Sequence, residues 1–318
     1  MKRILCGLLV CLLIVLPLCG CGEERDGGRV KIVCTVFPLY DWVRNVVGEV
    51  EGVEVLWLSD NGSDLHSFQP SASDMIEISS ADLTVYVGGV SDTWVADALK
   101  NGNKSSAMAL SEEAGMVVRP VSAESGHSHE DGHNHEMDEH VWLSLKNAMV
   151  AVDRIALRLG ELDEVYKEEY RANADAYIER LRRLDVSFAE HIQNATNPRL
   201  LFADRFPFVY LTEDYGIGYR AAFSGCTTDT DADFSTVIGL AETADRWGVR
   251  YLMVTEHSDG ALAESVIRAT KSKNQTVLRM NSMQAVRAEE AESGTTYLSV
   301  MERNLLVLLQ ALQLDLDD

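Results

Sequence analysis

The sequence "DEVYKEEYRANADAYIERLRRLDVSFAEHIQNA", residues 163–195, decides the organisation of this 318-residue chain. Its apolar residues recur at spacings of three and four, and it contains neither glycine nor proline. The pattern predicts a single helix of roughly 50 Å, at about 1.5 Å per residue. A helical joint is stiff, so two units connected by it should tilt slightly and not close by a large hinge motion.

Strand-like and helix-like segments alternate on both sides of this stretch, which is typical of parallel sheets with functional loops at the strand ends. We therefore predict an α/β fold of two lobes with parallel sheets, joined by the one long helix. The predicted strands are 30–37, 53–59, 82–89, 199–204, 248–256 and 275–282. The predicted divisions are an N-terminal lobe at 30–162, a linking helix at 163–195 and a C-terminal lobe at 196–318.

The first residues, "MKRILCGLLVCLLIVLPLCGC", have the pattern of a secretory signal: two basic residues, a short apolar run and small residues before a cysteine. The run is too short for an ordinary membrane span. Because "LCGC" resembles a bacterial lipobox, we expect a signal peptide at 1–20, lipidation of Cys21 and a polar tether at 21–29. A plain signal peptide with unmodified Cys21 is the alternative. Either reading places the working protein outside the cytoplasmic membrane.

The charge balance limits the partners. The chain has 50 Asp and Glu residues against 28 Lys and Arg, a formal net charge of −22. This balance argues against nucleic acid and anionic lipid as partners, because their phosphates would repel the chain. A negative field favours cations, although acidity also serves solubility.

A histidine-rich segment, "SGHSHEDGHNHEMDEHVW" at 125–142, holds five of the eight histidines. Its glycine, serine and alternating polar residues predict a loop at 125–139 without packed structure. The loop histidines lie two apart, so each pair can share a metal ion, and they are His127, His129, His133 and His135. Ordering such a loop costs about 1–2 kcal/mol per residue, so we expect it to collect or sense zinc more weakly than a preorganised cleft.

Four segments resemble the solute-binding lipoproteins of zinc and manganese ABC importers, the cluster A-I metal-binding proteins. They are "CTVFPLYDWVRNVVGE", "GSDLHSFQPSASDMIEISSADLTVYVGG", "DEHVWLSLKNA" and "GTTYLSVMERNLLVLLQAL". The resemblance implies a periplasmic-binding-protein-like fold of the helical-backbone type, with one metal ion between the lobes and two ligands from each. It also implies a monomer that is not an enzyme and that delivers metal to a permease and its ATPase.

The N-terminal ligands implied by the resemblance are His66 and His140. His66 lies in a turn-rich loop between two predicted strands, where an imidazole can project into a cleft. Neutral imidazole is a good zinc ligand, and its second nitrogen needs an acceptor that sets the tautomer. Imidazole favours zinc over manganese, which prefers oxygen. Zn²⁺ is therefore the expected ion and Mn²⁺ the competitor.

The C-terminal half departs from the family pattern. An ungapped match for the third ligand falls on Arg205, which cannot bind a cation, and a one-residue offset falls on Asp204. The fourth ligand matches Asn281, a neutral oxygen donor. Glu256, at the end of a predicted strand, is an anionic alternative, and His257 follows it. We predict the set His66, His140, Asp204 and Glu256, with Asn281 and His257 in reserve, while Asp204 serves equally well as an ion-pair partner.

Two cysteines, Cys34 and Cys226, lie outside the signal and lipobox. An oxidising compartment permits them to pair. The resemblance places both segments near the cleft, where a bridge would tie the lobes together. Two separate buried cysteines are the alternative.

Two other classes of function are compatible with a zinc site. A zinc hydrolase needs an open coordination position and a general base, and the sequence contains neither an H-E-x-x-H motif nor a nucleophile elbow. A surface adhesin or zinc-scavenging lipoprotein without a permease would have the same metal site.

Overall fold

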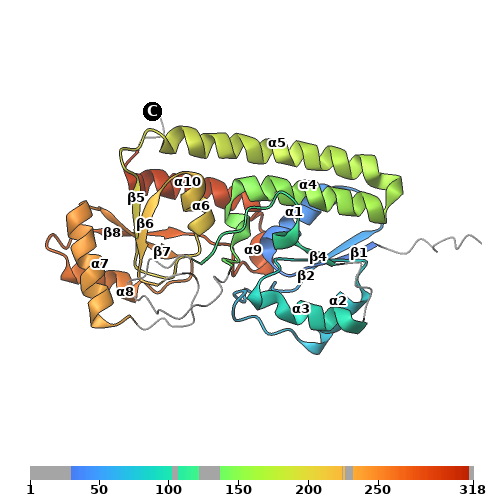
Figure 1. Ribbon diagram of the computed structural model, residues 1–318, viewed down its shortest axis with the longest axis horizontal. Helices are drawn as coiled ribbons and strands as arrows, with labels where there is room; N and C mark the ends of the chain where they lie inside the picture. The colour runs from blue at the N-terminus through green and yellow to red at the C-terminus, as the bar shows by residue number, and fades with distance from the viewer. Residues whose placement is uncertain (1–29, 102–106, 122–136, 224, 226–231, 315–318) are drawn as a thin grey trace, which may run out of the picture.

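The computed structural model describes residues 30–101, 107–121, 137–223, 225 and 232–314. Two α/β lobes lie side by side, and the long helix α5 runs along both of them (Figure 1). Each lobe is built on a four-stranded parallel sheet, ordered β2-β1-β3-β4 in the first lobe and β6-β5-β7-β8 in the second. The first strand of each lobe is therefore an inner strand, and the predicted fold class is confirmed.

The elements of the N-terminal lobe are β1 Val30–Cys34, α1 Phe37–Val47, β2 Val53–Trp57, α2 Ala72–Ser80, β3 Leu83–Tyr86, α3 Thr93–Ala98, β4 Ala107–Ala109 and α4 Leu145–Leu162. The linking helix is α5 Lys167–Ile192. The C-terminal lobe contains β5 Arg199–Phe202, α6 Val209–Asp214, β6 Gly218–Ala221, α7 Phe234–Trp247, β7 Tyr251–Thr255, α8 Ala261–Ala269, β8 Thr276–Met280, α9 Ala288–Glu292 and α10 Tyr297–Leu312.

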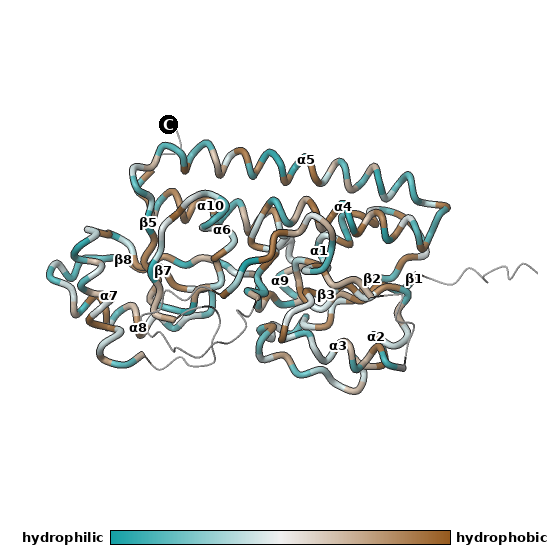
Figure 2. Tube along the Cα trace, viewed as in Figure 1, coloured by the Kyte–Doolittle hydropathy of each residue, from teal (hydrophilic) through white to brown (hydrophobic). Residues whose placement is uncertain are grey.

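Helix α5 confirms the prediction of one long linking helix, with ends inside the expected range. Residues Glu164–Tyr166 form a separate 3₁₀ turn, and Asn197 has a left-handed φ of 60° just before Pro198. The buried side chains of α5 repeat every three or four residues, and the tube in Figure 2 alternates between hydrophilic and hydrophobic along this helix. One apolar stripe therefore holds α5 against the rest of the protein.

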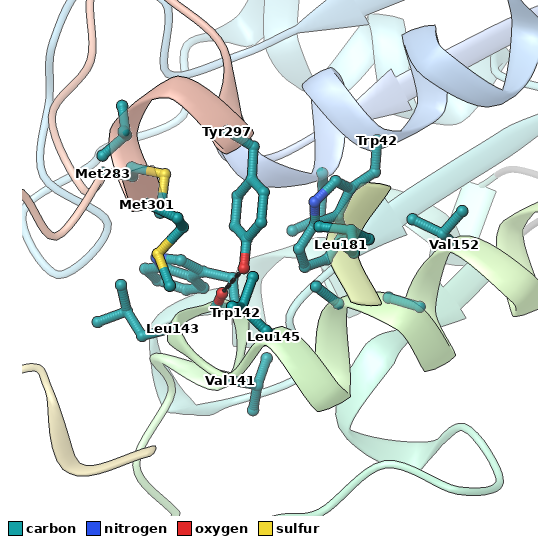
Figure 3. Packing of buried hydrophobic residues seen from close by; sticks show 14 of the residues in the cluster. Trp42, Val141, Trp142, Leu143, Leu145, Val152, Leu181, Met283, Tyr297 and Met301 are labelled. Carbon is teal, nitrogen blue, oxygen red and sulfur yellow. Dashed lines mark hydrogen bonds between the residues drawn. The ribbon is translucent and has the colours of Figure 1, made fainter. Parts of the chain in front are cut away.

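The two lobes share one hydrophobic core. Trp42 of α1 packs edge-on against Tyr297 at the start of α10, with ring centroids 5.1 Å apart. Tyr297 donates its hydroxyl hydrogen to the Trp142 carbonyl, 2.6 Å away, and both rings lie in the packed cluster of Figure 3. Tyr177 of α5 donates to the Asp41 carboxylate of α1 at 2.9 Å. Helices of both lobes and α5 thus meet in one buried junction.

Other expectations fall outside the described residues. These are the signal peptide, Cys21, Cys226 and the loop histidines His127, His129, His133 and His135. Cys34 is fully buried in β1, and burial raises the pKa of its thiol. The Cys34–Cys226 bridge stays a prediction. Within the part of the chain that the structure describes, no helix is long and apolar enough to cross a membrane.

Candidate metal centre

His66 lies in the loop between β2 and α2, at the carboxyl edge of the N-terminal sheet. Its backbone N–H donates to the Asp64 carboxylate at 2.9 Å, so the preceding turn orients the residue. The side chain is 19% exposed, so part of it stays accessible to solvent.

His140 is buried, directly before a 3₁₀ turn over Val141–Leu143. The Asp138 carboxylate accepts hydrogen bonds from the His140 backbone N–H at 3.0 Å and from its ring Nδ1 at 2.8 Å. Tyr210 of α6 donates to the Asp138 carbonyl at 2.7 Å. The ring of Trp142 packs edge-on against the imidazole, with centroids 5.3 Å apart. Several contacts therefore fix this ring.

A second carboxylate orients His66. Ser91 donates its backbone N–H and its hydroxyl to Glu139, at 2.7 and 2.5 Å. The His66 Nδ1 lies 2.9 Å from the Ser91 hydroxyl oxygen and 3.2 Å from Glu139. Burial alone would raise the pKa of Glu139, but hydrogen bonds from His66 and Ser91 outweigh it, so this pKa is lowered. Glu139 packs so closely on Gly89 that an added Cβ would lie 1.9 Å from its oxygen.

These partners assign the ring protons. The Ser91 hydroxyl gives its hydrogen to Glu139, so it accepts from the Nδ1–H of His66, and Asp138 accepts from the Nδ1–H of His140. Each neutral ring then presents the lone pair of Nε2. A carboxylate behind the imidazole is the usual way to orient and strengthen a histidine metal ligand.

The two Nε2 atoms face each other at 3.3 Å. Two nitrogens bound to one zinc at about 2.0–2.1 Å with a tetrahedral angle lie about 3.3–3.4 Å apart. The observed separation is thus that of one edge of a zinc coordination tetrahedron. His66 and His140 fit a metal ion without any change in their spacing.

Asp204 follows β5, but its carboxylate is turned to the neighbouring strand β7. It accepts the backbone N–H of Thr255 at 3.0 Å, the Thr255 hydroxyl at 2.7 Å and the Arg205 backbone N–H at 2.8 Å. Arg205 instead reaches the other lobe, where its guanidinium lies 3.8 Å from Asp64. Asp204 therefore supports the strand ends of its own lobe in this arrangement.

Glu256 follows β7, and both of its carboxylate oxygens accept hydrogen bonds from Ser282. The side-chain oxygen of Asn281 accepts the Met283 N–H at 2.7 Å, and the ring of His257 contacts the Ala285 carbonyl at 3.2 Å. Among the described residues, no three His, Cys, Asp or Glu side chains form a group that could hold a metal ion. His66 and His140 are brought together, whereas the C-terminal ligands stay a prediction.

A cavity of about 290 Å³ lies between the lobes beside the His66 loop. Asp64 and Ser67 line it from the N-terminal lobe, and Glu256, His257 and Gln284 line it from the other. The His66 loop and the loops after β5, β7 and β8 therefore border one space, although neither His66 nor His140 itself lines it.

Sequence reasoning did not identify Ser91, Asp138, Glu139 and Trp142. Three of them stand next to His140 in "DEHVW", where two carboxylates before a histidine are a local signal for an acceptor. Ser91 has no such signal, because the fold brings it to His66 across 25 residues.

Two parallel α/β lobes and a pair of oriented imidazoles define a two-lobed metal-binding protein. The chain matches, over residues 32–311, the family described as zinc-uptake complex component A, periplasmic, and it belongs to that family. It is 32% identical over 314 residues to the zinc-binding lipoprotein AdcA of Streptococcus pneumoniae serotype 4, covering 98% of this chain and 61% of that protein. This chain thus spans about three fifths of the length of the AdcA relatives.

A shorter relative is the high-affinity zinc uptake system protein ZnuA of Bacillus subtilis. It is 26% identical over 319 residues, which cover 96% of this chain and 97% of that protein. The crystal structure of the Zn(II)-bound ZnuA-like domain of Streptococcus pneumoniae AdcA superimposes with a TM-score of 0.72 at 28% identity. That alignment covers 89% of this chain and 99% of that domain.

Proposed function

We propose that this chain captures zinc in the cleft between its lobes and delivers it to the permease of an ABC importer. The observation that carries the proposal is the pair of Nε2 atoms 3.3 Å apart, each on a ring whose Nδ1 contacts a carboxylate or a carboxylate-bound serine. Membership of the zinc-uptake family supports the same cargo. Manganese is the competing cargo, and imidazole ligands favour zinc.

The C-terminal lobe supplies the remaining ligands in this proposal. The sequence predicts Asp204 and Glu256 as these donors, with Asn281 and His257 in reserve. Both oxygens of Glu256 accept hydrogen bonds from Ser282, so we keep Asp204, whose carboxylate has to turn from Thr255 to bind an ion, with Asn281 and His257 as the other candidates. His257 lines the cavity between the lobes, which supports a donor on this side.

We further propose that a lipid on Cys21 anchors the chain outside the bacterial cytoplasmic membrane. The lipobox-like "LCGC" supports this location. The relatives described above, a zinc-binding lipoprotein and a zinc uptake system protein, support an anchored carrier that works with a permease and an ATPase.

Zinc titration of the mature chain tests the metal centre. His66→Ala and His140→Ala should each weaken zinc binding by several kcal/mol, because structural-type zinc binding is worth about 10–16 kcal/mol in total. Competition with a chromophoric chelator measures the dissociation constants, and elemental analysis of the purified chain identifies the metal.

His191→Ala is the matched control, because the His191 ring contacts the Ser187 carbonyl within α5. It should leave zinc affinity unchanged. Wild-type affinity in His66→Ala and His140→Ala would remove the basis of the proposal.

A further inference from the structure

We propose that Glu256 is a positioning residue of the metal centre, which holds His140 in place through Ser282 and Trp142. The inference rests on the proposed function, because it concerns zinc binding by the same pair of imidazoles. In this proposal Glu256, a carboxylate of the C-terminal lobe, orients His140, a proposed metal ligand of the N-terminal lobe.

The first link lies within the C-terminal lobe. Glu256 accepts the Ser282 backbone N–H at 2.9 Å with one oxygen and the Ser282 hydroxyl at 2.8 Å with the other. Ser282 is only 1% exposed, so water competes little for these charge-assisted bonds. The carboxylate therefore fixes both the backbone and the side chain of Ser282.

The second link crosses between the lobes. The Ser282 carbonyl accepts the indole N–H of Trp142 at 2.8 Å. Trp142 is fully buried, and its own carbonyl accepts the Tyr297 hydroxyl at 2.6 Å. Figure 3 shows Trp142 in a cluster with Tyr297 and Met301 of α10. The indole is thus held by its ring nitrogen and its backbone, and both partners belong to the C-terminal half.

The third link reaches the ligand. The Trp142 ring meets the His140 imidazole edge-on, with centroids 5.3 Å apart and planes at 66°. Asp138 accepts hydrogen bonds from the backbone N–H and from the ring Nδ1 of His140, and a hydrogen bond at one ring atom still permits the imidazole to rock about it. Trp142 packs against the ring and opposes that motion. The direction of the Nε2 lone pair, and hence the spacing to His66, depends on both contacts.

The loop after β8 needs the support that Glu256 gives. Met283 is a buried non-glycine residue with φ of 61°, a left-handed conformation that side chains disfavour. Asn281 accepts the Met283 N–H, and Asn304 of α10 hydrogen-bonds both the N–H and the carbonyl of Asn281. With Glu256 on Ser282, the backbone is fixed on both sides of the carbonyl that receives Trp142.

The geometry favours positioning over direct ligation. In the described part of the chain Glu256 does not complete a metal-binding group with His66 and His140. Both of its oxygens are directed at Ser282. A carboxylate in this role changes zinc affinity without entering the coordination sphere.

Three variants of the mature chain test the relay. Trp142→Phe keeps a ring beside His140 and loses the indole N–H. Ser282→Ala loses the hydroxyl hydrogen bond to Glu256, and Glu256→Gln weakens both hydrogen bonds between Ser282 and residue 256. Chelator competition should show zinc affinity about tenfold lower for Trp142→Phe and Glu256→Gln, as for other outer groups that orient metal ligands, and a smaller loss for Ser282→Ala. The double variant Glu256→Gln/Trp142→Phe should bind no more weakly than the weaker single variant.

Cobalt substitution separates positioning from ligation. The visible spectrum of bound Co²⁺ should keep its shape in Glu256→Gln, because the ligand set is unchanged. Trp57→Phe is the matched control, since Trp57 also donates its indole N–H to a serine, Ser59, and should bind zinc like the wild type.

A changed Co²⁺ spectrum in Glu256→Gln, with wild-type affinity in Trp142→Phe and Ser282→Ala, would overturn the proposal and make Glu256 a ligand. Support for the relay and its contradiction are both distinguishable from failure of the proposed function, because in that case His66→Ala and His140→Ala would bind zinc normally.

Discussion

At the scale of single residues, the chemistry of the site depends on which ring nitrogen carries the proton. Asp138 accepts the Nδ1–H of His140 and is itself almost completely buried. A buried carboxylate behind a histidine both selects the tautomer and strengthens the nitrogen that faces the metal. We therefore expect the zinc affinity of the proposed centre to depend on Asp138 through its hydrogen bond to His140.

Asp138→Asn should lower zinc affinity about 10- to 100-fold, the usual cost of losing such a partner. The neutral amide accepts the Nδ1–H more weakly and can also donate a hydrogen, which favours the wrong tautomer. Isothermal titration at neutral pH measures the change. Asp163→Asn removes a carboxylate that accepts from Tyr170 at the start of α5 and should have no effect. Equal affinities for the two variants would contradict the assigned tautomer.

The sequence predicted that His66 and His140 lie together, and the structure places their Nε2 atoms 3.3 Å apart, whereas it did not predict the hydrogen-bond partners of Asp204 and Glu256. His66 and His140 stand in segments whose order and composition match a family pattern. Asp204 was predicted from a one-residue offset to the family pattern and Glu256 from its place at the end of a predicted strand, and several hydrogen-bonding roles satisfy a carboxylate at a strand end. The partners Thr255 and Ser282 could not be anticipated, because they come from neighbouring strands and loops of the folded sheet.

At the scale of elements, length and burial decided which predictions succeeded. The 26 residues of α5 repeat their apolar positions many times, and the inner strands β1, β5 and β7 have near-continuous apolar sequences. Two edge strands escaped notice. β4 has only three residues, and β6 "GYRA" contains Arg220 and is only partly buried, so neither has an apolar run long enough to indicate a strand. An edge strand is defined by its neighbour more than by its own sequence.

The histidine-rich loop is an element whose role can be separated from that of the cleft. Deleting residues 126–136 should leave one tight zinc equivalent and remove about one or two weaker ones, since a loop that must be ordered binds less tightly than a preorganised pair of rings. Equilibrium dialysis with zinc counts the equivalents.

A second variant keeps the length of this loop and replaces His127, His129, His133 and His135 by Ser. It should behave like the deletion, because the imidazoles and not the loop length bind the metal. Loss of the tight equivalent in both variants would show that loop histidines complete the centre with His66 and His140.

At the scale of the whole molecule, the lobes are joined by more than the linking helix. The Asp41 carboxylate of α1 accepts from Tyr177 of α5, and Arg119 of the N-terminal lobe forms ion pairs with Glu213 and Asp214 of α6. Tyr297 connects α10 to the Trp142 backbone. A two-lobed molecule with these connections, of which the Tyr297–Trp142 bond is fully buried, should move by small tilts, as the stiff helix predicts.

The same junction makes stability depend on pH. Burial raises the pKa of Asp41 to about 6, against the opposing hydrogen bonds from Tyr177 and the Tyr297 backbone and the charges of Arg180 and Arg44. The folded protein therefore binds this proton more tightly than the unfolded chain. The stabilisation is fully present below the unfolded pKa near 4 and is lost as the pH rises through 6.

Asp41 should thus make the metal-free protein more stable at pH 5 than at pH 7, by about 1 kcal/mol. Asp92 acts in the same direction, since burial also raises its pKa to about 6. Urea unfolding in EDTA at pH 5, 6 and 7 measures the slope for the wild type and for Asp41→Asn. In Asp41→Asn the difference in unfolding free energy between pH 5 and pH 7 should fall by about half, because of these two carboxyl groups only Asp92 remains to titrate with a raised pKa. An unchanged slope in Asp41→Asn would mean that the junction of α1, α5 and α10 tolerates the ionised carboxylate, and that the pH dependence arises elsewhere in the molecule.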